Sequence, residues 1–499
     1  MPQPFAAVLA LLATVLATAP LVASEGPDPC QRALLERGYG MFCHFGLNTF
    51  HQKEWSDGTL PAASFNPTAL DCDQWVRTAK EAGFRHIVLV TKHHDGFCLW
   101  DSVATDYDVG SAPVKTDIVG EVAKACKKYD VALGLYYSLW DRHEPTHREK
   151  DPTAYIAFMK RQLTELLTNY GPIVELWFDG GWAKPDADWR IPEVYRPIKD
   201  LQPNCAVTVN HTIGIPGGKP GAFRNPEDLR EGDPIRFWPV DFRTKDPNLQ
   251  RADDPKRYLG PDGRLHWLPF EHTICISDRW NWFQKKDATP ARSPDELEEM
   301  YYWCTAGSAL LVNLPPDQTG RLRENERQAI LATADLLGIR GGRTPLPAPP
   351  VNQALGAKAE ADSVWDDEHG PAAAIDASLE WTRWAAKATP ATLTLTPAQP
   401  FVFDRVALHE FSENKGLGDG FSTLRLFRTR EWVLEARRGE GWDAIAMGTT
   451  LGVKVLRFAE PITADGLRLR ILATEGGPAS IYHVSVSDSR TRRPRSLPY

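Results

Sequence analysis

Short apolar segments alternate with amphipathic segments along the first two thirds of the chain, and this alternation predicts an α/β fold. The apolar segments, which predict buried strands, are 39–45, 86–92, 131–138, 173–179, 205–210, 273–277 and 309–314. The amphipathic segments, which predict helices, are 71–82, 117–128, 153–169, 192–201, 293–306 and 323–337. This order indicates a (β/α)8-like barrel with one degraded unit around 225–260. A doubly wound open sheet is the alternative, although no glycine-rich phosphate loop follows an early strand.

The pattern changes after a stretch rich in glycine and proline at 341–350, which predicts a linker. Beyond it, short runs of alternating polar and apolar residues are separated by turn residues, which is typical of a β-sandwich. These runs are 392–395, 405–411, 424–434, 454–458, 467–472 and 481–487. We therefore predict a barrel domain over 25–340 and an all-β domain over 351–499.

The first 24 residues predict a signal peptide. Residues 6–22 are apolar and rich in alanine, and small residues precede the expected cleavage point after Ser24. A membrane anchor is the alternative, but Pro20 interrupts the apolar stretch. The expected mature protein is exported, either secreted or periplasmic, with no membrane attachment after cleavage.

Composition excludes some functions. The net charge of −8 comes from 57 basic and 65 acidic residues without a long run of one sign, which argues against nucleic-acid binding. The eight cysteines lack metal-ligand spacing, so they predict no metal site and define no disulfide. The triplet of His93, His94 and Asp95 could ligate a metal, but adjacent side chains at a strand end point in different directions.

Polar and aromatic residues follow four successive predicted strands. Among them are His44, the pair His93 and His94, Tyr137, and Trp177 with Asp179. Each of these alone is compatible with a structural role. Together they indicate an active site, because the carboxyl ends of barrel strands meet at one face. No serine or cysteine nucleophile motif accompanies them, and aromatic faces beside a carboxylate suit a sugar ring.

Five segments closely resemble glycoside hydrolase family 29, the retaining α-L-fucosidases; they are 43–47, 91–100, 135–138, 176–180 and 310–316. The resemblance implies a (β/α)8-like barrel, double displacement, and no cofactor or metal. It places Asp179 at the position of the family's nucleophile. The positions that match residues holding the fucose ring are His44, Glu54, Trp55, His93, His94, Tyr137 and Trp177. We also expect Trp282, with Trp280, to line the pocket or to pack beneath it.

The general acid/base is not fixed by the resemblance, because the family supplies it from a variable region. The candidates are Glu231, which we favour because it follows a strand's carboxyl end, then Glu271 and Glu227. The family's common Asn-Asp-Arg-Trp is replaced by 210–213, so its arginine contact is absent.

Two hypotheses therefore follow from the sequence. The first is an exported α-L-fucosidase that releases terminal fucose from glycans or glycoconjugates. The second is a catalytically impaired fucose-binding protein on the same barrel. A third and weaker possibility keeps the enzyme but exchanges fucose for galactose.

The C-terminal region has its own resemblance. Segments 357–363, 374–376 and 382–384 are similar to discoidin, or F5/8 type C, sandwiches. This implies either sugar binding, as in many carbohydrate-binding modules, or a structural domain packed on the barrel.

Overall fold

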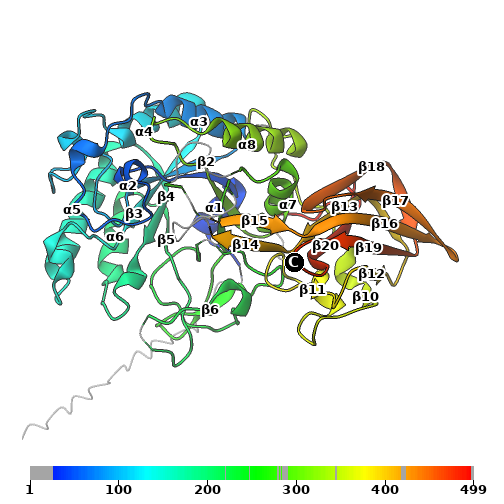
Figure 1. Cartoon of the computed structure of the whole chain (residues 1–499). Coiled ribbons are helices and arrows are strands. Elements are labelled where there is room, and N and C mark those ends of the chain that lie inside the picture. Colours follow the sequence, from blue (N-terminus) through cyan, green and yellow to red (C-terminus); the bar gives the residue numbers. More distant parts are fainter. Residues whose placement is uncertain are drawn as a thin grey trace, which may run out of the picture.

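The computed structural model describes residues 26–495 except 220, 247, 278–279, 281, 284–289, 343–344 and 417–422. The expected signal peptide, 1–24, lies outside the described residues. A curled α/β unit is followed by an all-β unit (Figure 1). Among the helices that the structure describes, none is long and apolar enough to cross a membrane.

The first unit is built on a seven-stranded parallel sheet with the order β5-β4-β3-β2-β1-β9-β8. Its strands are β1 (Tyr39–Cys43), β2 (His86–Lys92), β3 (Ala132–Ser138), β4 (Ile173–Asp179), β5 (Ala206–Val209), β8 (Glu271–Cys275) and β9 (Ala309–Asn313). The chain adds these strands in order around the sheet, so the strand order never reverses. The predicted barrel-like fold is confirmed, and the doubly wound alternative is wrong.

Helices cover the outer face of this sheet (Figure 1). They are α3 (Cys72–Glu81), α4 (Ile118–Tyr129), α5 (Thr153–Asn169), α6 (Ile191–Leu201), α7 (Pro294–Cys304) and α8 (Glu324–Leu337). Helix α1 (Pro29–Arg37) differs, because its Leu34 side chain joins the apolar cluster inside the barrel. The short α2 (Leu47–His51) belongs to the segment that follows β1. The six helices predicted from the apolar periodicity are all present within a few residues of their expected ends. The start of α7 shows why: the Ser293 side chain accepts a hydrogen bond from the Glu296 backbone, and Pro294 occupies the first turn.

An irregular segment, 241–244, fills the gap between β5 and β8. On one side the Asp241 backbone N–H donates to the Val207 carbonyl at 2.8 Å. On the other side the Glu271 backbone N–H donates to the Arg243 carbonyl at 3.0 Å. The Phe242 side chain joins the apolar cluster inside the sheet. This segment therefore takes the place of the degraded strand and closes the barrel, while β6 (Arg257–Leu259) and β7 (Leu265–Trp267) form a separate hairpin.

The second unit is a sandwich of two antiparallel sheets, ordered β10-β12-β19-β16-β17 and β11-β20-β13-β18. Its strands are β10 (Lys358–Ala361), β11 (Trp384–Ala385), β12 (Ala391–Thr396), β13 (Phe401–Glu410), β16 (Thr429–Arg438), β17 (Gly441–Gly448), β18 (Val453–Ala464), β19 (Gly466–Thr474) and β20 (Ser480–Ser487). The predicted all-β region is confirmed. Some strands gave no sequence signal; β17, for example, lies at a sheet edge and has no fully buried residue.

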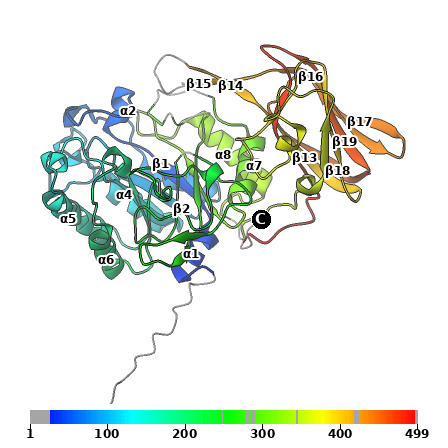
Figure 2. The same ribbon diagram turned by 90° about the horizontal axis from the view of Figure 1, so that it is seen from below.

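One hairpin belongs to neither sheet. Strands β14 (Ser412–Gly416) and β15 (Thr423–Phe427) pair only with each other in the described part of the chain. Figure 1 and Figure 2 show this hairpin extending from the sandwich towards the barrel. The sequence segment 424–434, predicted as one strand, is therefore divided between β15 and β16.

Candidate active site

Asp179, the last residue of β4, is the centre of the site. Its Oδ2 accepts from the Tyr136 hydroxyl at 2.9 Å and lies 3.5 Å from His94 Nε2. Its Oδ1 accepts from Asn210 Nδ2 at 3.0 Å and from Trp182 Nε1 at 3.2 Å. The carboxylate is only 6% exposed, and these polar partners offset the cost of removing it from water.

The turn after β4 requires glycine. Gly180 has φ 77°, and a Cβ atom there would lie 2.6 Å from the Trp140 Cβ. The sharp turn leaves the Asp179 carboxylate at the carboxyl end of the barrel, where the loops of a (β/α)8 fold form the active site.

Three buried histidines, His44, His93 and His94, surround this carboxylate. Burial, followed by the neighbouring imidazole, lowers the pKa of His44 and of His93 well below the ordinary value. The pKa of His94 falls to about 3 for the same reasons. Two of these rings are oriented: His44 Nδ1 lies 3.2 Å from Asn313 Oδ1, and His94 Nδ1 lies 2.6 Å from Ser138 Oγ. Neutral imidazoles can both donate to and accept from sugar hydroxyls.

Indole rings line the site on two sides. Trp55, Trp140 and Trp182 form a cluster, in which the Trp182 ring centroid lies 5.5 Å from that of Trp55 and 5.3 Å from that of Trp140. On the other side, Trp280 lies 5.0 Å from the His44 ring and Trp282 lies 5.1 Å from the His93 ring. Trp55 is 40% exposed, whereas Trp282 is 1% exposed. The arrangement therefore has an open aromatic rim and a closed aromatic wall.

A second carboxyl group, Asp246, lies two residues after the segment that replaces the degraded strand. Thr273 Oγ1 donates to Asp246 Oδ1 at 2.7 Å. The Asp246 backbone N–H donates to Asn210 Oδ1 at 3.1 Å, so the Asn210 amide connects Asp246 with Asp179. Burial and then the negative charge of Asp179 raise the pKa of Asp246 to about 7. This position was missed from the sequence, because the segment before it has no apolar run.

Glu54 is the third carboxyl group of the site. It is 5% exposed. Burial raises its pKa well above the ordinary value, and the charges of Asp246 and Asp179 add to this effect, while Trp282 and Trp280 oppose it. The site thus combines Asp179 with two acids that hold their protons more tightly than usual.

A protein-family model described as Alpha-L-fucosidase matches residues 50–342. The chain belongs to the alpha-L-fucosidase family. It is 30% identical over 463 residues to Alpha-L-fucosidase 1 of Arabidopsis thaliana, covering 89% of this chain and 83% of the plant protein. It is 27% identical over 350 residues to the tissue alpha-L-fucosidase of Mus musculus, covering 61% of this chain and 69% of the mouse protein.

A solved structure gives the same result. A glycoside hydrolase 29 family member from an unknown rumen bacterium has a TM-score of 0.54 and 25% identity, covering 93% of this chain and 77% of the other. Membership of the alpha-L-fucosidase family makes this protein a glycoside hydrolase.

One of the residues expected to hold the fucose ring points away from the site. Tyr137 does not face the site: its hydroxyl lies 2.8 Å from Lys92 Nζ and 2.7 Å from Gln162 Oε1, on the helix-covered face of the sheet. Neighbouring side chains of a strand point to opposite faces, so Tyr136 is the one that reaches Asp179. The register of β3 against β4, which pairs Tyr136 with Trp177, is the information that the sequence lacked.

Trp177 lies inside the barrel, one layer below Asp179. It is fully buried, its ring stacks with Tyr136 at 6.3 Å, and its Nε1 donates to Glu271 Oε1 at 2.8 Å. It therefore supports the site from beneath, by holding the tyrosine that donates to Asp179.

The two glutamates proposed from the long loop lie in different surroundings. Glu231 is exposed in a turn, where the next N–H, from Gly232, donates to the Arg257 carbonyl at 3.0 Å. Glu227 is half-buried, and its negative charge, like that of Asp179, acts on Lys245. Within the described ranges, neither of them forms a hydrogen bond to a partner of Asp179, as Asp246 does to Asn210.

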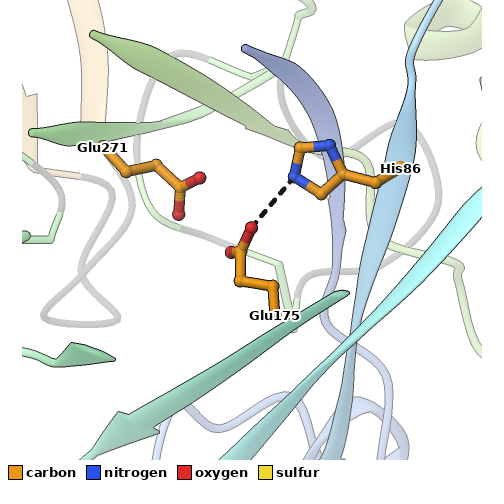
Figure 3. A group of neighbouring side chains, drawn as sticks. All are labelled: His86, Glu175 and Glu271. Atoms are coloured by element: carbon orange, nitrogen blue, oxygen red, sulfur yellow. Dashed lines mark ion pairs between the residues drawn. The ribbon is translucent and has the colours of Figure 1, made fainter. Parts of the chain in front are cut away.

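Glu271 lies at the other end of the barrel. It begins β8, and its side chain points towards His86, which begins β2, and Glu175 of β4 (Figure 3). His86 Nε2 lies 3.3 Å from Glu175 Oε2. In the described part of the chain these three form the group whose spacing would suit a metal ion. Burial and the adjacent Glu175 charge raise the pKa of Glu271 well above its ordinary value. A proton shared between the Glu271 and Glu175 side chains therefore explains how two acids can be buried side by side. This placement argues against Glu271 as the acid/base.

We expect Glu271→Gln to reduce the loss of stability at alkaline pH. A raised pKa in the folded state means that the stabilisation is complete below the unfolded value, about 4.3, and is lost as the pH rises towards the folded value. Glutamine cannot ionise but can still accept from Trp177. As the pH rises above the unfolded value of about 4.3, the Tm of the variant should therefore fall less than the wild-type Tm.

Glu231→Gln is the matched control, because the same change is made at an exposed site. Its Tm should follow that of the wild type, and both variants should keep their activity within a few-fold. An equal pH dependence for Glu271→Gln and the wild type would contradict the shared proton.

Proposed function

We propose that this protein is an exported, retaining α-L-fucosidase that hydrolyses terminal α-L-fucosyl linkages of glycans or glycoconjugates. The observation that carries the proposal is the pair of carboxyl groups at the carboxyl end of the barrel. The Asp179 carboxylate accepts a hydrogen bond from the Asn210 side-chain amide. The Asp246 backbone N–H donates to the same amide, and the pKa of the Asp246 carboxyl group is raised to about 7.

In this proposal Asp179 attacks the anomeric carbon while the Asp246 carboxyl group gives its proton to the departing oxygen. Formation of the fucosyl ester removes the negative charge of Asp179. Because that charge helps to raise the pKa of Asp246, the pKa should fall at this step. Asp246 is then suited to take a proton from the water that hydrolyses the ester, which frees Asp179 again.

The surrounding groups fit a 6-deoxy sugar. The neutral imidazoles of His44, His93 and His94, with the carboxyl group of Glu54, can bind ring hydroxyls. The indoles of Trp280 and Trp282 offer apolar surface for the sugar's C–H face and methyl group.

The alternative of a catalytically impaired binding protein loses part of its support. It rested on an unassigned acid and a missing arginine. Asp246 supplies an acid, and Lys245 supplies a positive charge that interacts with Asp179. The hydrolase is therefore the function that the geometry supports best.

Two further parts of the proposal rest on the sequence. The apolar N-terminal stretch supports export, and hence a secreted or periplasmic location. The short resemblance to F5/8 type C domains supports a discoidin-like type for the observed sandwich.

A panel of aryl glycosides tests the substrate assignment. We expect hydrolysis of 4-nitrophenyl α-L-fucoside and at least about tenfold lower kcat/KM for the α-L-galactoside, because its extra hydroxyl must enter an apolar wall. The β-D-galactoside should not react. Hydrolysis of a galactoside at a higher kcat/KM than the fucoside would contradict the assignment to fucose.

A further inference from the structure

A cavity beside the site is formed jointly by the barrel and the sandwich. Its volume is about 620 Å³, within the range of ligand-binding pockets. The barrel contributes Glu54, Trp55 and Trp280 of the proposed fucose site. The sandwich side contributes Glu380, Trp381, Asn414 and Tyr482, among others. The same space therefore runs from the fucose site onto the second domain.

Buried ion pairs fix the sandwich against helix α7 of the barrel. Arg425 of β15 binds both oxygens of Glu296, at 2.8 and 2.7 Å. Arg405 pairs with Glu298 and Glu299. Although burial alone would raise the pKa of Glu296, Arg292 and Arg425 lower it to about 2. Carboxylates that stay charged in the junction hold the domains in one arrangement, because separating them would break several desolvated pairs.

Trp381 presents an aromatic face to this cavity. Its side chain is 39% exposed, and its Nε1 donates to the Leu249 carbonyl of the barrel unit at 3.1 Å. This bond sets the direction of the ring, while much of its face stays open. Nearby, Asn414 of the β14–β15 hairpin and the exposed Glu380 add polar groups. A fixed indole with polar neighbours is an arrangement that suits a sugar ring.

We propose that the sandwich provides the binding site for the sugars to which the fucose is attached. This inference rests on the proposed fucosidase activity and adds the substrate class: oligosaccharides with two or more sugar residues beyond the fucose. A single fucose ring fills only the barrel end of the cavity, so the sandwich end is left for the rest of the glycan. The domain would act as part of the active site rather than as a separate carbohydrate-binding module.

The test compares two substrates in four proteins. The substrates are a fucosylated trisaccharide and 4-nitrophenyl α-L-fucoside, and the proteins are the wild type, Trp381→Ala, Trp381→Phe and Trp365→Ala. Trp365 is the matched control, since it is a 55% exposed tryptophan of the same domain that does not line the cavity.

We expect Trp381→Ala to lower kcat/KM for the trisaccharide by about 10-fold or more, mainly through KM, and to change the aryl fucoside less than about 3-fold. Trp381→Phe, which keeps an aromatic face, should recover most of the loss, and Trp365→Ala should behave as the wild type. Asn414→Ala gives a second test on the exposed hairpin if Trp381→Ala does not fold.

The outcomes separate the two proposals. If the wild type does not hydrolyse the aryl fucoside, the proposed activity fails. If it does, but the cavity variants lower both substrates equally or change neither, the fucosidase stands and the role of the sandwich is overturned.

Discussion

Replacing Asp179 by glycine should lower kcat/KM for 4-nitrophenyl α-L-fucoside by on the order of 10⁴-fold or more. The reason is specific to this carboxylate, since no other carboxyl group of the site accepts hydrogen bonds from Tyr136, Asn210 and Trp182 together. Removing it also leaves space for a small anion. Azide should therefore restore turnover and give β-L-fucosyl azide, the product of a single inversion.

Asp186→Gly is the matched control, because Asp186 is an exposed aspartate in the turn that follows the same strand. It should keep wild-type kinetics and give no azide product. If Asp179→Gly kept substantial activity, or if azide rescue gave the α-azide, Asp179 could not be the nucleophile.

Replacing Asp246 by asparagine should have an effect that depends on the leaving group. An aryl fucoside with a very acidic phenol needs little protonation, so its kcat/KM should fall by about 10-fold or less. An oligosaccharide needs a full proton transfer, and its kcat/KM should fall by about 10²- to 10⁴-fold. Azide should attack the fucosyl ester, which hydrolyses slowly without a base, and give the α-azide.

The pH profile provides an independent measurement for Asp246. A general acid must be protonated in the free enzyme, so wild-type kcat/KM should fall as the pH rises through about 7. Asparagine cannot ionise, and this alkaline limb should disappear in the variant.

Glu54→Gln is the control for a carboxyl group in the same pocket with a different role. It should change both substrates by the same factor, because it alters binding of the ring and not protonation of the leaving group. If Glu54→Gln showed the dependence on the leaving group and Asp246→Asn did not, the two roles would have to be exchanged.

The barrel could be predicted because its strands are continuous apolar runs, and its site because such runs end in polar residues at one face. Asp246 could not be predicted in the same way. The segment before it contains Asp241 and Arg243, whose charges are compensated by partners outside the segment: Lys199 lies 2.7 Å from Asp241, and Arg243 pairs with Asp254. Without knowledge of these partners, the segment resembles a loop, and no sequence pattern marks the eighth position of the barrel.

The choice between Tyr136 and Tyr137 also needed the structure. Two adjacent tyrosines at a strand end cannot be distinguished by residue type. Only the register with β4 shows which one faces inward. The shared cavity depends on the docking of two domains, which is encoded in arginines and glutamates more than 100 residues apart, such as Arg405 and Glu298. Patterns within a single segment carry no information about such pairs.

We propose that this protein hydrolyses α-L-fucosides with retention through Asp179. The most direct test follows the wild-type reaction on 4-nitrophenyl α-L-fucoside by proton NMR during the first turnovers. With retention, α-L-fucose should appear first and then slowly mutarotate to the β-anomer. Immediate appearance of β-L-fucose, or no release of fucose at all, would contradict it.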